Sequence, residues 1–597
     1  MKSFAQKGLL CILVSVMLLA GCGTTPATPS ASASAAASTA ASETAAASAS
    51  ETASDPVADV AFPPKEMTKL TAFVMTPFAG ANGDYNNNYV TDYIRKNANI
   101  DITFTNASGD DGKTKLNLLM ASGDTLPDFF LTTKWTKAET LLYGKQGLII
   151  PLTEMLKDAP NWNMLNTKAP FRKGDLTLPD GNIYTYGDCN ECFHCNYQSR
   201  MWIYKPWVDK LAGGKMPTTT DELYTFLKAV KEKDPNGNGK ADEIPLTGHI
   251  AAGGWATDPT TFLINSFIQC NNMLSNTNPI PGAGFVINNG KVEYQFVKDG
   301  YREALVYLNK LYKEGLLDSQ AFTQDGTQTT ASTQAEPNLV ALASGGWWPS
   351  KVDELFVGQD GPYQDWTMLE PVKGPNGVQL APFYPNGYFG SCVGTISADC
   401  KNPELVVKLF DYLASEEMSL IQVWGPKGIA WDSVTEGTSI SGGKATYKQI
   451  PAEKKKEDGT PDYTAFGLDF AKYNWDTDAA ILNNTSDVRL ALFSEDPNRS
   501  VEGLLYQYGK LYSKYKPEDA TVMPNLAFEE DDARKIADYT VSIGKYVNQA
   551  TVQFITGDLN IETDWQTYLD KLNGMDVAGY VAVQQKGYDA FMKSLGN

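Results

Sequence analysis

The spacing of apolar residues predicts strands that alternate with helices from about residue 66 onward. Leu70 to Thr76 and Ile100 to Thr105 have the composition of strands, and Asn88 to Asn97 between them is helical in pattern. A helix over Lys113 to Ala121 precedes a turn and a further buried strand that ends at Leu131. Strands that alternate with helices pair in parallel through right-handed crossovers, so this order predicts an α/β fold.

Later helices have recognisable ends. Pro217 to Lys233 is amphipathic, and Thr219 and Glu222 near its start have capping-box spacing. A second helix is expected over about Tyr301 to Glu314. A third should begin at Asn402-Pro403, with Asn402 as its cap and the proline in its first turn, where a missing N–H is tolerated.

The chain opens with the pattern of an export signal. A short basic region precedes an apolar run from Gly8 to Ala20, which is too short for a comfortable membrane span. Leu19-Ala20-Gly21-Cys22 has the form of a lipobox, although an ordinary secretory signal containing a cysteine is the alternative. We expect a signal peptide over 1–21, a palmitate-type lipid on Cys22 and a disordered Ala-, Ser- and Thr-rich tether over 22–64. The globular body would then lie on the extracytoplasmic face of a bacterial cell membrane, held by the lipid anchor only.

Composition narrows the function. The formal net charge is −20 and no Lys/Arg-rich run exists, which argues against a nucleic-acid partner because phosphate neutralisation dominates such binding. Only two histidines are present, His194 and His249. No nucleophile elbow, HExxH helix or phosphate-binding glycine loop is found, so we expect no enzyme. A secreted glycoside hydrolase or lyase with paired carboxylates stays open as the alternative, since spacing in sequence cannot exclude such a pair.

A loop at 234–243 has the pattern of a calcium site. Oxygen-bearing side chains alternate and are followed by a glycine, as in the first six positions of an EF-hand loop, although Pro245 replaces the usual twelfth-position glutamate. The candidate ligands are the side chains of Asp234, Asn236, Asn238, Asp242 and Glu243 and the backbone carbonyl of Lys240. An all-oxygen set suits calcium better than a transition metal. The alternative is a polar turn after a helix that binds nothing.

Several segments resemble family 1 extracellular solute-binding proteins, the sugar-binding components of bacterial ABC importers. The likeness begins at Leu119 to Phe130 and Gln146 to Leu152, and it spans roughly residues 66 to 590. It continues through Trp202-Ile-Tyr, Trp207-Val-Asp-Lys-Leu, Pro217-Thr-Thr-Thr-Asp-Glu-Leu, Tyr307 to Asp318, Gly374-Pro-Asn-Gly, Asn402-Pro-Glu-Leu, Phe554-Ile-Thr-Gly-Asp and Trp565. Each motif is weak alone, but their order along the chain is specific. The subgroup that the chain looks closest to is the long oligosaccharide- and alginate-type lipoproteins, whose calcium ligands the loop at 234–243 matches one for one.

This resemblance implies a two-lobed periplasmic-binding-protein-like (type II) α/β fold with a cleft between the lobes. The first lobe would comprise 65–185 and about 395–425, and the second about 186–394 and 426–597. The calcium would be structural. The chain would capture a carbohydrate, expected to be an oligosaccharide, in the cleft and deliver it as a monomer to the transmembrane subunits of an ABC permease. A glycan-sensing lipoprotein without transport is a further alternative, and the identity of the sugar is beyond the sequence.

Aromatic side chains are the candidates for ligand contact, because sugar sites stack ring faces on them. Trp347 or Trp348 after a predicted strand is the strongest candidate; adjacent residues cannot both point inward on a strand. The remaining aromatic candidates are Trp255, Trp135, Tyr388, Trp431 and Trp475, and Thr132 is a polar candidate. Core packing is the alternative for each aromatic.

Cysteines gather in one short segment. Cys189, Cys192 and Cys195 lie close to His194 at overlapping CxxC spacings, a pattern that soft metals also use. The chain is expected outside the cytoplasm, where disulfides are allowed, so a local disulfide or free thiols are favoured over zinc or a cluster. Cys392 and Cys400 could pair across a hairpin.

Overall fold

A computed structural model describes residues 60–76, 84–169, 171–250, 255–271, 283–356, 358–384, 394–450, 470–475 and 479–594. Residues Asp59–Asn597 form one compact unit. The expected signal peptide, the lipidated Cys22, most of the tether, Tyr388 and Cys392 lie outside the described residues.

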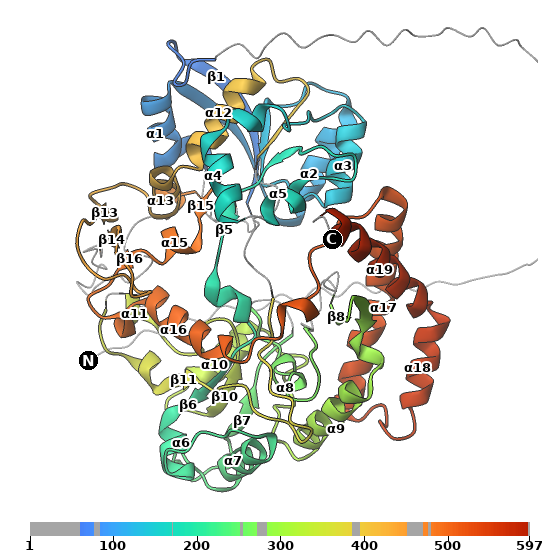
Figure 1. The fold of residues 1–597 in the computed structure, drawn as a ribbon. Coiled ribbons are helices and arrows are strands. Elements are labelled where there is room, and N and C mark those ends of the chain that lie inside the picture. The colour runs from blue at the N-terminus through green and yellow to red at the C-terminus, as the bar shows by residue number, and fades with distance from the viewer. Residues whose placement is uncertain are drawn as a thin grey trace, which may run out of the picture. The chain divides into compact units, whose positions relative to one another are not determined.

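A five-stranded sheet organises the first part of the fold, and four of its strands lie in the blue-to-teal part of the chain in Figure 1. Its order is β2 (Ile100–Ser108), β1 (Thr68–Thr76), β3 (Phe129–Leu131), β12 (Gly394–Ile396) and β4 (Thr185–Tyr186). β1 pairs in parallel with β2 and β3, as the alternation of strands and helices predicts. β12 joins antiparallel, so a strand from far along the chain completes the sheet.

Short helices surround this sheet and close its core. They are α1 (Tyr89–Ala98), α2 (Gly109–Ser122), α3 (Lys137–Lys145), α4 (Pro160–Lys168), α5 (Phe171–Leu176), α12 (Pro403–Leu413), α13 (Glu416–Trp424), α14 (Phe470–Tyr473) and α15 (Ser486–Arg489). Buried apolar residues of α1 and α12 pack with the strands in one cluster. Burial of these faces supplies most of the stability that such short helices lack alone.

A second sheet has the order β11 (Trp366–Met368), β6 (Met201–Tyr204), β10 (Val340–Ser344) and β7 (Ile244–Thr247). β10 and β7 are parallel, and β6 runs antiparallel to β10 and β11. β8 (Phe285–Asn288) and β9 (Lys291–Tyr294) form a separate antiparallel hairpin. A small third sheet contains β13 (Trp431–Ser433), β14 (Tyr447–Gln449) and β16 (Leu492–Phe493).

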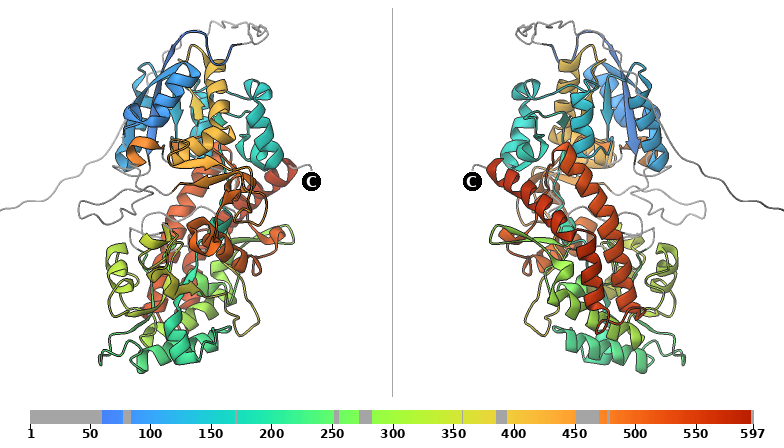
Figure 2. Two further views of the ribbon diagram at one scale, coloured as in Figure 1. Left: turned by 90° about the vertical axis from the view of Figure 1, so that its left-hand side faces the viewer. Right: turned by 90° about the vertical axis from the view of Figure 1, so that its right-hand side faces the viewer.

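The second sheet has its own hydrophobic core, which includes the C-terminal helices. The helices around it are α6 (Lys205–Ala212), α7 (Thr220–Glu232), α8 (Thr261–Ile264), α9 (Asp299–Lys313), α10 (Gly326–Thr333), α11 (Asp353–Phe356), α16 (Val501–Ser513), α17 (Glu530–Thr556), α18 (Trp565–Gly574) and α19 (Val577–Ser594). Figure 2 shows α17, α18 and α19 in red as adjacent long helices, and α17 packs on α9. Among the described residues, no helix has both the length and the apolar character needed to span a bilayer.

The chain passes from the first sheet to the second between β4 and β6. On the way it forms β5 (Cys189–Asn190) and the 3-10 helix η3 (Phe193–Tyr197). β5 pairs in parallel with β15 (Asn483–Asn484), a segment close to α16 in sequence. Two connecting segments are therefore hydrogen-bonded to each other. The domain boundaries expected from the sequence stay a prediction.

Two expected helix caps differ in detail. Thr219 does accept the backbone N–H of Glu222, but the Glu222 carboxylate binds the N–H and hydroxyl of Thr218 instead of completing the box. Asn402 occupies the cap position of α12, yet its side chain makes no capping hydrogen bond. Pro403 stands in the first turn as expected, so the fixed dihedral of proline starts this helix without the asparagine.

Candidate functional site

The carboxyl ends of β7 and β10 bring two tryptophan turns together. The strands are parallel, with Leu342 opposite Leu246, so the loops that follow them leave the same edge of the sheet. The backbone N–H of Gly346 donates to the carbonyl of Trp255 at 2.8 Å, and Ser344 Oγ donates to the Thr257 carbonyl at 2.5 Å. These bonds fix the two turns against each other.

The adjacent tryptophans after β10 point different ways. Trp347 is 40% exposed, whereas Trp348 is 4% exposed and packs on Trp202 with ring centroids 5.0 Å apart. The planes of the two rings meet at 85°. Trp255 is half-buried beside them. Two accessible indole rings therefore stand at one sheet edge, an arrangement suited to the apolar faces of sugar rings.

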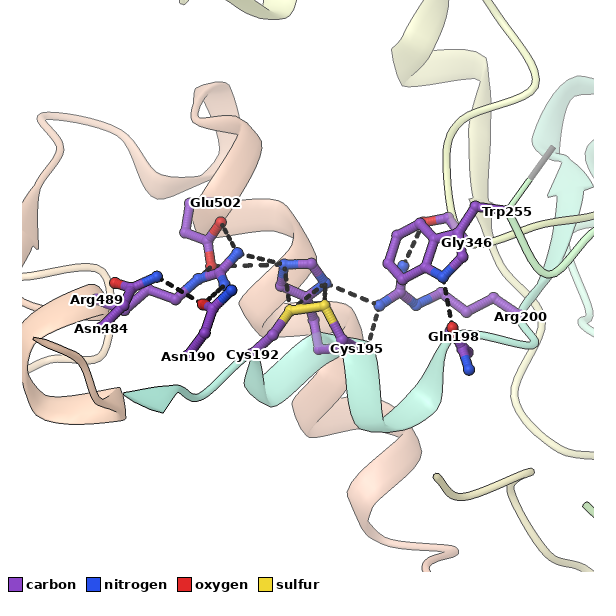
Figure 3. Close-up of a disulfide and its surroundings, with 11 residues drawn as sticks. Asn190, Cys192, Cys195, Gln198, Arg200, Trp255, Gly346, Asn484, Arg489 and Glu502 are labelled. Atoms are coloured by element: carbon purple, nitrogen blue, oxygen red, sulfur yellow. Dashed lines mark hydrogen bonds and ion pairs between the residues drawn. A yellow bond between two sulfur atoms is a disulfide. The ribbon is translucent and has the colours of Figure 1, made fainter. Parts of the chain in front are cut away.

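The half-buried Gln198 and the buried Arg200 both contact Trp255 (Figure 3). Its indole N–H donates to Gln198 Oε1, and the Arg200 guanidinium carbon lies 5.6 Å from its ring centroid. Arg200 Nη1 also donates to the Gly346 carbonyl at 2.6 Å, which joins both tryptophan turns to one side chain. Burial lowers the pKa of Arg200 to about 10, so it stays a cation at neutral pH.

A series of side-chain contacts extends from Arg200 through His194 to Arg489 and Glu502. Arg200 Nη2 lies 3.1 Å from His194 Nδ1, and Arg489 Nη2 lies 3.3 Å from His194 Nε2. Arg489 forms two bonds with Glu502, at 2.8 and 3.1 Å. Burial alone would raise the pKa of Glu502, but Arg489 and His194 hold it well below its usual value. Sequence reasoning missed Arg200 and Gln198, because only the fold brings them under Trp255.

Cys192 and Cys195 form a disulfide against the His194 ring, in agreement with the interpretation that the sequence favours. Cys189 and Cys270 are buried free thiols, and Cys400 is a free thiol as well. Burial raises the pKa of Cys189 far above its usual value, so this thiol is inert.

The loop after β3, on the first sheet, contains the candidate ligand residues Thr132 and Trp135. Thr132 and Lys134 have φ of 55° and 51°, which non-glycine residues rarely adopt. Thr132 is fully buried, and its hydroxyl makes no hydrogen bond within the described part of the chain. Strained residues of this kind gather at ligand sites. Trp135 is 4% exposed and packs on Phe130 and Tyr143, so its ring is part of the core.

Two further candidates are also core residues in this structure. Trp431 is 1% exposed and donates its indole N–H to the Gly425 carbonyl at 3.0 Å. Trp475 is 1% exposed and stacks on Tyr85 with ring centroids 5.2 Å apart. Like Trp135 and Trp348, they offer no ring face here, because neighbouring side chains cover them.

The loop after α7 gathers its acidic and amide side chains on one side. Asp234, Asn236, Asn238, Asp242 and Glu243 are all half-buried. The Asp234 carboxylate accepts the backbone N–H groups of Gly237 and Gly239, at 2.8 and 2.9 Å. Asn238 Nδ2 donates to both oxygens of Asp242 at 3.1 Å.

Three carboxylates are close together in this loop. Glu243 Oε1 is buried and makes no hydrogen bond within the described residues. Burial raises the pKa of Glu243, and the nearby Asp234 and Asp242 raise it further. A bound cation would relieve this repulsion, and a turned amide group would present its oxygen in place of its NH₂. The residues therefore fit a calcium ion.

A hollow of ≈ 750 Å³ lies between the loop after α5 and the C-terminal helices. Its walls include Lys137, Asp175, Phe528, Asp532 and Lys586. Two of its cations form ion pairs on their own sides, Lys137 with Asp175 and Lys586 with Asp532, each at 2.5 Å. No sequence motif indicated this hollow.

The sequence model of one family, described as bacterial extracellular solute-binding protein, matches residues 79–419. The chain belongs to this family. The match covers more than half of the chain and includes the second sheet and every strand of the first sheet except β1. This solute-binding protein also has the mixed α/β fold that the sequence predicts.

Known proteins resemble this solute-binding protein along almost its whole length. The fructooligosaccharide ABC transporter substrate-binding protein FusA of Streptococcus pneumoniae is 27% identical over 99% of this chain and 98% of its own length. Two solved structures of FusA, one with kestose and one an EF-hand mutant with fructo-nystose, match with TM-scores of 0.66. They are 23% and 24% identical and cover 88% of this chain and 100% of theirs. An extracellular solute-binding protein of Bifidobacterium longum subsp. infantis matches with a TM-score of 0.71 at 21% identity, over 88% of this chain and 98% of that one.

Proposed function

We propose that this solute-binding protein captures an oligosaccharide at the tryptophan turns and delivers it to the permease of an ABC importer. The observation that carries the proposal is the pair of accessible rings, Trp255 and Trp347, fixed together at the carboxyl ends of two parallel strands. FusA, a relative along almost the whole chain, is described as a fructooligosaccharide ABC transporter substrate-binding protein. This supports a fructooligosaccharide or a similar neutral oligosaccharide as the ligand class.

The ligand would act by favouring one arrangement of the two sheets over another. A sugar that touches the Trp255 and Trp347 turns on one sheet and the Thr132 loop on the other stabilises the arrangement in which both are close. Thr132 offers a hydroxyl that has no partner within the described residues. The chain acts as a monomer held at the extracytoplasmic face by a lipid on Cys22.

The loop at 234–243 would hold calcium as a structural ion. Asp234, Asp242 and Glu243 supply carboxylates, Asn236 and Asn238 amide oxygens, and Lys240 its carbonyl. Calcium there would offset two of the three carboxylate charges and fix the turn between α7 and β7. The ion takes no part in sugar recognition, because the proposed recognition lies at the opposite, carboxyl end of β7.

Calorimetric titration with kestose, nystose and oligogalacturonides tests the recognition site. Trp347→Ala and Trp255→Ala should each weaken sugar binding by at least tenfold, because loss of a stacked ring costs about 1.4 kcal/mol or more of binding free energy. Trp424→Ala is the matched control, since Trp424 is a half-buried tryptophan on α13. Equal affinity in all variants would refute the proposed site. Sugar cleavage by the wild-type protein would refute the proposal of a carrier.

A further inference from the structure

The Cys192–Cys195 disulfide lies in an unusual electrostatic setting (Figure 3). Cys192 Sγ is 3.5 Å from His194 Nε2, the nitrogen that Arg489 also approaches. Cys195 Sγ is 3.8 Å from His194 Nδ1, the nitrogen that Arg200 also approaches. Each sulfur therefore shares a ring nitrogen with a guanidinium group.

The positive charge around the disulfide exceeds the negative charge. Arg489 is neutralised by Glu502, but Arg200 forms no ion pair with a carboxylate within the described residues. Arg200 is fully buried, and its Nε makes no hydrogen bond there either. A buried cation without a counterion is unfavourable, so this site would gain from an added negative charge.

Reduction of the disulfide would supply that charge. A thiolate is the form that neighbouring cations stabilise, and a disulfide whose thiolates are stabilised is easier to reduce. The two guanidinium groups oppose a divalent metal at the same atoms, which argues against zinc on the reduced cysteines. The setting therefore favours redox chemistry of the sulfurs over metal binding.

We propose that Cys192–Cys195 is a redox-active disulfide, reducible by an external dithiol, whose state controls the position of Trp255. The link to Trp255 runs through Arg200, which contacts both Gly346 and Trp255 in the oxidised form. A thiolate next to His194 would compete for the Arg200 guanidinium and so loosen the support of the tryptophan turns.

The reduction consists of two exchange steps. Cys195 is the more accessible cysteine, since Cys192 is 4% exposed and Cys195 is half-buried. A thiolate of the dithiol attacks Cys195 Sγ, the bond between the cysteines breaks, and Cys192 leaves as a thiolate beside Arg489 and His194. The second thiol of the dithiol then attacks the mixed disulfide and releases Cys195. The dithiol gives two electrons and becomes a disulfide, and its two protons go to solvent or to the cysteines.

A redox titration of the full chain tests the first half. The protein is equilibrated in buffers of reduced and oxidised dithiothreitol, alkylated and digested, and the peptide that contains both cysteines is quantified by mass. Arg200→Met should shift the midpoint toward more reducing buffers, and Arg200→Lys should restore part of the shift. Arg499→Met is the control, because Arg499 is an exposed arginine paired with Asp360. Should Arg200→Met fail to fold, Arg489→Met tests the same point. A midpoint that neither variant moves overturns the proposal.

Tryptophan fluorescence tests the second half without any sugar. Reduction should change the emission of the wild-type protein, and the change should be smaller in Trp255→Phe. An identical change in both proteins overturns the link to Trp255.

Sugar affinity gives a further readout, which rests on the proposed function. The reduced wild-type protein should bind sugar at least threefold more weakly than the oxidised protein, whereas the Cys192→Ser/Cys195→Ser variant, which has no thiolate to compete for Arg200, should bind sugar like the oxidised protein. Equal affinities of the reduced and oxidised wild-type protein overturn control of binding by the disulfide. Absence of binding in every form instead refutes the proposed function, and the redox proposal is then decided by the midpoint and the fluorescence.

Discussion

His194 is a neutral imidazole locked between two arginines, and its burial has a consequence for stability. Burial lowers the pKa of His194 to about 4, against about 6.5 in an unfolded chain. Between these values the unfolded chain binds a proton that the folded chain does not. The free energy of unfolding should therefore fall as the pH falls from about 6.5 to 4.

Urea unfolding at pH 7 and pH 5 measures this effect. The wild-type protein should lose on the order of 2 kcal/mol more than His194→Gln over this interval, because one proton is linked to unfolding. His249, the only other histidine of the chain, is kept in both proteins, so its contribution cancels. Equal losses in the two proteins would contradict the prediction.

Sequence patterns identified candidate functional residues, but they did not predict how deeply each side chain is buried. The tryptophan pair and the cysteine cluster are visible as motifs, and the contrast between the exposed Trp347 and the buried Trp348 was expected, although both residues lie beyond the end of β10. The sequence could not separate exposed from buried aromatics elsewhere, because Trp431 and Trp475 are covered by residues distant in sequence, such as Tyr85.

At the scale of elements, α4 shows how distant parts of the chain fix a helix. Its first turn has no cap of its own, and the carboxylate of Asp411 on α12 accepts the backbone N–H groups of Asn161 and Trp162, at 3.2 and 2.8 Å. The Tyr186 hydroxyl donates to the same carboxylate at 2.8 Å. One buried acid therefore ties a helix and a strand to α12.

Asp411→Ala should reduce the free energy of unfolding by about 2–4 kcal/mol, because it leaves several buried donors without an acceptor. Glu417→Ala is the comparison, since its exposed pair with Lys427 should contribute less than about 1 kcal/mol. Urea unfolding measures both, and similar losses in the two variants would argue against the capping role of Asp411.

The loop at 234–243 joins α7 to β7, so a bound calcium would act on the connection between these two elements. Calcium at 100 times its Kd should stabilise the protein by about 2.7 kcal/mol, so EDTA should lower Tm. Asp242→Asn should reduce or abolish the EDTA response, whereas Asp221→Asn, on the exposed first turn of α7, should keep it. An unchanged Tm of the wild-type protein in EDTA would exclude a bound calcium.

Helices were easier to predict than caps. The helical spacing of Leu223, Phe226 and Val230 anticipates the buried face of α7, because amphipathic periodicity depends only on local sequence. The cap of α4 could not be anticipated, because Asp411 is 250 residues away from Asn161. The same limit applies to β12, which enters the first sheet from a distant part of the chain.

For the whole molecule, the order of motifs along the sequence was sufficient to indicate the family. The contacts between connecting segments could not be predicted from the sequence. The pairing of β5 with β15 and the chain of contacts from Glu502 to Trp255 depend on three segments that meet only after folding. No local pattern marks them.

Ligand binding should stabilise the molecule as a whole. A sugar at 100 times its Kd should raise the free energy of unfolding by about 2.7 kcal/mol, since it binds the folded state only. Thermal unfolding over a series of kestose concentrations measures the rise in Tm. Trp347→Ala should need at least ten times more sugar for the same rise, and an equal response would contradict a role of this ring in binding.

The half-buried position of Cys195 also affects how the protein is handled in the laboratory. Protein purified from a reducing cytoplasm, or stored with dithiothreitol, would carry thiols where exported protein carries a disulfide. Two preparations of identical sequence could then give different dissociation constants in the same buffer. The oxidation state of Cys192 and Cys195 is therefore a property to record with each measurement, alongside concentration and temperature.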